Sequence, residues 1–111
     1  MYVVVTGPPG AGKSTLARSL ALELGRHAIR VNTVVPGHID GPSLRMHFEM
    51  EAARLGISVE AARAAIVGDA ALQRIATPEE VAEAIVFFAS PASSAITGQA
   101  LHVNGGQFFA A

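Results

Sequence analysis

A glycine-rich segment near the start of the chain carries the residues best suited to chemistry. Residues 7–14 read GPPGAGKS, which fits the spacing G-x-x-x-x-G-K followed by Ser or Thr. Glycines let successive backbone N–H groups point at an anion, and the N-terminus of the following helix adds unpaired donors. Lys13 would place an ammonium on the β- and γ-phosphates, and Ser14 would offer a hydroxyl to Mg²⁺. The segment therefore predicts binding of phosphate or of an ATP-like nucleoside triphosphate with Mg²⁺.

The predicted phosphate site consists of Gly7, Pro8, Pro9, Gly10, Ala11, Gly12, Lys13, Ser14 and Thr15. Together with the preceding run YVVVT, it resembles the P-loop nucleoside-triphosphate hydrolases and kinases, in the form typical of their ATP-using branches. That family also needs an acidic residue at the end of a second hydrophobic strand. The matching run, VNTVVPG, ends without one, and Asp40 is the candidate that could approach Ser14 and contact Mg²⁺.

Two interpretations of this segment follow from the missing acid. The leading one is binding of a phosphate-bearing small molecule with little or no hydrolysis, so that no catalytic residue is assigned. The alternative is a scaffold whose glycine-rich turn is formed but binds nothing tightly. Loss of binding in Lys13→Ala would separate the two.

Several later segments carry a different resemblance. Residues 21–32 (ALELGRHAIRVN), 35–39 (VPGHI), 74–82 (RIATPEEVA) and 97–106 (TGQALHVNGG) follow one another in the order typical of the short-chain dehydrogenase/reductase family. The resemblance covers residues 19–108 and the C-terminal part of such an enzyme. In that family the Pro-Gly stretch helps hold the nicotinamide end of the cofactor and continues to a threonine near the phosphates. This sequence has Gly41 at that place, and Asn104 where the family usually has aspartate.

The catalytic groups of that family are not found in the sequence. Its members use a serine with a Tyr-x-x-x-Lys pair, whereas the only tyrosine here is Tyr2 and the only lysine is Lys13. Without that acid, hydride transfer has no proton donor. We therefore expect no dehydrogenase activity and no bound NAD(P), with residual NAD(P) binding as a weaker alternative.

The two resemblances together suggest a chimera of engineered origin. Its seam is expected near residues 17–20, within a continuous helix that both families would place after a strand. The pattern predicts strands at 2–6, 28–35 and 100–104, and helices at 13–24, 44–55, 58–67 and 78–89, the second and third capped by Ser43 and Ser58. Strands separated by helices imply a small α/β fold with a parallel sheet of order 1-2-3, in a single domain covering residues 1–111.

Composition limits the remaining function classes. The chain has 111 residues, half of them hydrophobic, a net charge of −1 and no cysteine, with a mean hydropathy of +0.40. These values exclude disorder, disulfides and thiolate metal sites, and they argue against nucleic acid as a partner. Apolar runs are too short to cross a bilayer, so a cytoplasmic protein is expected. The surplus of apolar residues predicts a homo-oligomer that buries exposed helix and strand surfaces.

Overall fold

The secondary structure follows the hydrophobic pattern closely. The computed structural model describes residues 1–7 and 12–107. Its strands are β1 (Tyr2–Thr6), β2 (Arg30–Pro36) and β3 (Ala100–Val103), and its helices are α1 (Lys13–Leu24), α2 (Pro42–Leu55), α3 (Val59–Gly68) and α4 (Pro78–Ala89). Short 3-10 turns lie at Gly25–His27 and Pro91–Ser93. The predicted α/β class is confirmed.

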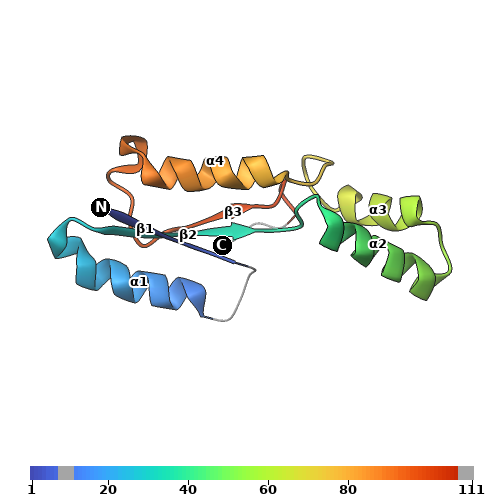
Figure 1. The fold of residues 1–111 in the computed structure, drawn as a ribbon, viewed down its shortest axis with the longest axis horizontal. Coiled ribbons are helices and arrows are strands. Elements are labelled where there is room, and N and C mark those ends of the chain that lie inside the picture. The colour runs from blue at the N-terminus through green and yellow to red at the C-terminus, as the bar shows by residue number, and fades with distance from the viewer. Residues whose placement is uncertain (8–11, 108–111) are drawn as a thin grey trace. The chain divides into compact units, whose positions relative to one another are not determined.

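The three strands form one parallel sheet in the order β1-β2-β3, as predicted. Tyr2 pairs with Arg30 at the start of β1, and Thr33 pairs with Ala100 at the start of β3. Helix α1 lies on one face of the sheet and α4 on the opposite face (Figure 1). The central strand β2 is covered on both faces, so its residues from Val31 to Val35 are buried. Such a strand is expected to be largely apolar, and β2 departs from this at two buried polar residues, Asn32 and Thr33.

The face of α1 toward the sheet is made of alanines. Ala17 and Ala21 are buried against Val31, whereas Leu16 is 57% exposed. Helical spacing would put Leu16 on one face with Leu20 and Leu24, but only Leu20 and Leu24 pack against the buried cluster. Small side chains four residues apart let the helix axis approach β2 closely, which turns Leu16 toward the outside.

The chain divides into two compact units. The first contains Met1–Pro36 and Glu79–Val103, and the second contains Gly37–Pro78 and the residues from Asn104 onward. In the second unit α2 and α3 pack together around Phe48, which is 2% exposed. The guanidinium of Arg63 lies 5.9 Å from the centre of the Phe48 ring, within cation–π range. The single-domain organisation expected from chain length stays a prediction.

The start of α2 differs from expectation. Its N-cap is Gly41, not Ser43, because Pro42 occupies the first helical position. Gly41 has no side chain to accept a hydrogen bond from the first turn. By contrast, the hydroxyl oxygen of Ser58 accepts a bond of 3.1 Å from the Ala61 N–H at the start of α3, as predicted.

We expect Gly41→Ser to stabilise the protein by about 0.5–1 kcal/mol, because it adds the missing cap oxygen and restricts the unfolded chain. Gly41 has an extended backbone, with φ 168°, and no atom lies within 4 Å of the position its Cβ would take. Urea denaturation gives the free energy of unfolding, with Gly41→Ala as the matched control that lacks the oxygen. Equal stability of the Ser and Ala variants would contradict a capping effect.

Some large apolar side chains stay exposed within the part of the chain that the structure describes. Met46, Met50 and Leu22 are more than 60% exposed. They are the surfaces on which the predicted homo-oligomer would depend, and that state remains a prediction. No helix among the described residues has both the length and the hydropathy needed to cross a membrane.

Candidate functional site: the hollow at the Pro-Gly turn

The turn after β2 is fixed by a close backbone approach. A Cβ on Gly37 would lie 2.5 Å from the Cβ of Asn104 and 3.1 Å from its Cα, so only glycine fits there. Asn104 is itself held, since its Oδ1 accepts a 2.9 Å bond from the Gly106 N–H. Because β2 ends at Pro36, the turn lies at the carboxyl end of a parallel strand. This is where α/β folds place ligand sites.

Beyond the turn, the loop is tied to the segment before α4. Ile39 forms an isolated parallel bridge with Ala76, and the Asp40 N–H donates a 3.0 Å bond to the Ala76 carbonyl oxygen. These contacts carry the loop toward the first turn of α2. They leave a cavity of about 350 Å³, which is lined by Gly37, His38, Ile39, Ser43, Leu44 and His47.

Two imidazoles and a hydroxyl give this cavity its polar groups. The rings of His38 and His47 are stacked, with centroids 6.2 Å apart and planes inclined by 19°. Ile39 and Leu44 supply an apolar wall, and Leu44 is buried. The arrangement can accept a flat ring that carries hydrogen-bonding substituents.

Charge near the cavity is carried by an exposed ion pair on α2. A 2.7 Å bond joins Arg54 Nη2 to Glu51 Oε2. This hydrogen bond lowers the pKa of the Glu51 carboxyl, and the charges of Arg54 and His47 lower it further. No three His, Cys, Asp or Glu side chains among residues 1–7 and 12–107 gather to hold a metal ion.

The predicted phosphate segment is only partly described. Pro8, Pro9, Gly10 and Ala11 lie outside the described residues. Lys13 folds back toward β1, since its Cδ and Cε lie 3.3 Å from the position of a Cβ on Gly7. Ser14 and Thr15 follow in the first turn of α1, and Asp40 belongs to the other unit.

The only tyrosine and the only lysine are separated along β1. Tyr2 begins the strand and Lys13 lies beside Gly7, just after its end. At about 3.3 Å per residue, the five steps from Tyr2 to Gly7 place the two side chains more than about 10 Å apart. The chain's own Tyr2 and Lys13 therefore do not form a catalytic pair.

Comparison with known proteins decides between the two resemblances. A family model described as enoyl-(acyl carrier protein) reductase matches residues 5–107. The chain belongs to the short-chain dehydrogenase/reductase family. A galactitol 2-dehydrogenase from Rhizobium johnstonii is 42% identical over 91 residues, which are 82% of this chain and 32% of that protein.

Solved structures of this family share the fold. A short-chain dehydrogenase family protein from Francisella tularensis superposes with a TM-score of 0.84 and 31% identity, over 96% of this chain and 50% of that one. An actinorhodin polyketide ketoreductase with NADPH gives a TM-score of 0.83 and 29% identity, over 96% and 46%. The chain thus spans about a third of the curated relative and about half of these structures.

The phosphate-site interpretation is corrected by this membership. The family match begins at residue 5 and runs through the expected seam at 17–20, so one family accounts for both sides of that seam. ATP with Mg²⁺ on Ser14 and Asp40 is therefore not supported, and the expected absence of NAD(P) conflicts with the family's use of that cofactor. The pattern misled because both families place a glycine-containing turn between a strand and a helix.

The sequence gives His38 only as part of the segment 35–39, with no partner. His47 lies nine residues later, on a helix, so no regular spacing links the two rings. Ser43 and Leu44 carry no motif either. The Pro-Gly turn was the available signal, and it located the cavity without naming its other walls.

Proposed function

We propose that this chain forms the nicotinamide side of an NAD(P)-dependent oxidoreductase of the short-chain dehydrogenase/reductase family. The observation that carries the proposal is the cavity directly after the Pro-Gly turn, where the family holds the nicotinamide end of its cofactor. The ketoreductase neighbour was solved with NADPH, which supports this class of cofactor.

The residues of the cavity suit a carboxamide-bearing ring. Ile39 and Leu44 offer apolar contact to its face, while Ser43 and the two histidines offer hydrogen bonds to its substituent. When bound, the nicotinamide supplies or accepts a hydride. Gly41, at the place of the family's threonine, contributes no side chain to the phosphates, so this chain holds the ring more firmly than the phosphate end.

Reduction of a carbonyl also needs a proton. The carbonyl carbon takes the hydride and its oxygen takes a proton, which a positioned side chain must deliver. Tyr2 and Lys13 are too far apart to act together. Among the side chains that line the cavity, the imidazoles of His38 and His47 are the proton-carrying groups, so we assign them this role within the residues of this chain.

Saturation-transfer NMR with reduced nicotinamide mononucleotide tests the proposal. We expect saturation of the nicotinamide ring protons in the unmodified protein and a signal reduced only about twofold in Ser43→Ala, which loses one hydrogen bond to the substituent but leaves the cavity open. Ser43→Trp should remove at least about four-fifths of that signal, because its indole fills the cavity. Ser43 is exposed on the first turn of α2, so both variants should fold.

A second ligand gives the matched control. We expect 2′,5′-ADP, which carries phosphates without nicotinamide, to receive little saturation. Equal saturation of the two ligands, or a nicotinamide signal that survives in Ser43→Trp, would contradict a ring site in this cavity.

A further inference from the structure

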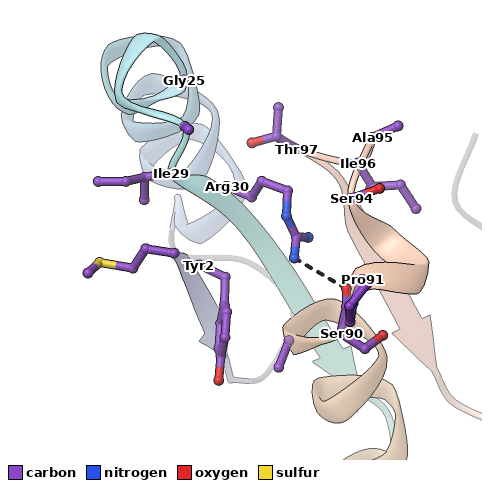
Figure 2. Close-up of a pocket in the computed structure, with 13 residues that line it drawn as sticks. Tyr2, Gly25, Ile29, Arg30, Ser90, Pro91, Ser94, Ala95, Ile96 and Thr97 are labelled. Atoms are coloured by element: carbon purple, nitrogen blue, oxygen red, sulfur yellow. Dashed lines mark hydrogen bonds between the residues drawn. The ribbon is translucent and has the colours of Figure 1, made fainter.

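The first unit contains a second cavity at the end of the sheet where the strands begin. Its volume is about 510 Å³. The starts of β1 and β2, the turn after α1 and the segment after α4 surround it (Figure 2). The Pro-Gly turn follows the opposite end of β2, at Pro36. This cavity is therefore separate from the proposed nicotinamide site and does not depend on it.

Arg30 supplies a fixed positive charge in this cavity. Its Nη1 donates bonds of 2.9 Å to both the carbonyl oxygen and the hydroxyl oxygen of Ser93, and its Nη2 donates a 3.4 Å bond to the Ser90 carbonyl oxygen. Ser93 is fully buried, so this anchor is rigid. Figure 2 shows the guanidinium reaching across the cavity toward the segment after α4.

The anchoring bonds use only part of the guanidinium. Arginine has five N–H donors, and three are engaged with Ser90 and Ser93. Among the described residues no carboxylate pairs with Arg30, and its Nε–H and one Nη2 N–H have no acceptor. A half-buried cation without a counter-charge, with two donors still open, favours an anion as its partner.

The remaining walls define what else the ligand must carry. Ile29, Ile96 and Ala95 give apolar contact, and Tyr2, Ser94 and Thr97 also belong to the lining. No acidic side chain lines the cavity. Arg30 is the one charged side chain among the lining residues, which matches the single charge of a carboxylate better than the higher charge of a phosphate. A carboxylate on a short hydrocarbon body matches both features.

We propose that this cavity binds a small monocarboxylate, whose two oxygens accept bonds from Arg30 and whose hydrocarbon part lies along Ile29 and Ile96. A purely structural role for Arg30 would be to cap the last carbonyl groups after α4. That role explains the three bonds to Ser90 and Ser93. It does not explain the two open donors or the absence of a counter-charge in the cavity walls.

In the test, hexanoate is titrated into the unmodified protein and its binding is observed by ¹H–¹⁵N NMR. We expect saturable shifts at the Arg30 Nε–H and at the Ile96 and Thr97 amides. Hexan-1-ol, which has the same chain without the charge, and acetate, which has the charge without the chain, should each bind at least about tenfold more weakly.

Variants at Ser94 keep the anchor of Arg30 intact, whereas Arg30→Ala would remove the cap and could unfold the segment. Ser94→Asp adds a negative charge to the lining of the cavity that contains Arg30 and should weaken hexanoate binding at least about tenfold. Ser94→Asn has nearly the same shape without the charge and should bind within about twofold of the unmodified protein. Ser94 is exposed, so neither change disturbs the core.

Three outcomes would overturn the proposal: unchanged affinity in Ser94→Asp, hexan-1-ol binding as tightly as hexanoate, or saturable shifts that leave the Arg30 Nε–H unmoved. None of these measurements involves nicotinamide, so failure here leaves the proposed oxidoreductase function unaffected.

Discussion

Replacing Asn32 by aspartate is expected to destabilise the protein by about 3–5 kcal/mol at neutral pH, because it buries an uncompensated charge. Asn32 lies in the middle of β2 with 1% of its surface exposed. Its Nδ2 donates a 3.0 Å bond to the Ile96 carbonyl oxygen, and its Oδ1 accepts a 3.1 Å bond from the Gln99 N–H. This amide joins β2 to the segment that leads into β3.

The loss in Asn32→Asp should depend on pH. A protonated carboxyl resembles the amide, since its O–H can donate to the Ile96 carbonyl oxygen and its other oxygen can accept from Gln99. Burial and that carbonyl raise the pKa of the introduced group in the folded state above its unfolded value of about 3.9. The folded variant therefore binds more protons between those two pKa values, so its stability falls as pH rises through the folded pKa and recovers as pH falls toward about 4.

Urea denaturation at pH about 7.5 and about 4.5 measures this effect. Asn32→Ala is the matched control: it leaves the Ile96 carbonyl and the Gln99 N–H unpaired, at a cost of about 2–4 kcal/mol that should not change with pH. Stability differences are taken against the unmodified protein at each pH. If Asn32→Asp showed no recovery relative to Asn32→Ala on acidification, the buried hydrogen bonds of Asn32 to Ile96 and Gln99 would not stabilise the protein as described above.

Elements whose formation depends on nearby residues were predictable from the sequence. Pro78 starts α4 and Ser58 caps α3, because proline and serine act on the first helical turn alone. The strand order also followed from pattern, since strands that alternate with helices pair in parallel through crossovers. In these cases the physics is contained within a few consecutive residues.

Features set by tertiary approach were not predictable in the same way. The buried face of α1 is alanine because the helix comes close to β2. No local rule predicts that Ala17, rather than Leu16, faces the sheet. The stacking of His38 on His47 needs both the Pro-Gly turn and the entry angle of α2. Likewise, nothing in the spacing of Arg30 and Ser93 reveals a bond between residues 63 apart in sequence.

The glycine-rich segment matches the spacing of a phosphate-binding motif, but the family that it indicated was wrong. Its strand, turn and helix are the parts that hold phosphate in one family, and the same order of parts recurs in another. Lys13 folds back over Gly7, but that geometry satisfies a strand-to-helix turn whether or not an anion is bound. Several weaker motifs spread in order along the chain proved more informative than one strong local pattern, because together they specify a whole sheet.

Gly37→Ala is expected to cost about 1–3 kcal/mol of stability and to remove the nicotinamide signal as well. The added methyl would lie 2.5 Å from the Asn104 Cβ and 3.1 Å from its Cα, and neither atom belongs to a flexible side-chain end. The turn or the strand end must therefore move. Because Gly37 also lines the cavity with His38 and Leu44, the same movement distorts the site.

Gly41→Ala is the matched control for this prediction. It makes the same change four residues later, where no atom lies within 4 Å of the added carbon. The poor N-cap preference of alanine opposes the gain from a more restricted unfolded chain, so its stability and its nicotinamide signal should stay close to those of the unmodified protein. Measuring saturation transfer under conditions where both variants are fully folded separates loss of the site from loss of the fold. A folded Gly37→Ala variant that keeps its full nicotinamide signal would show that the turn does not position the ring, and the cavity after β2 would then no longer support the proposed function.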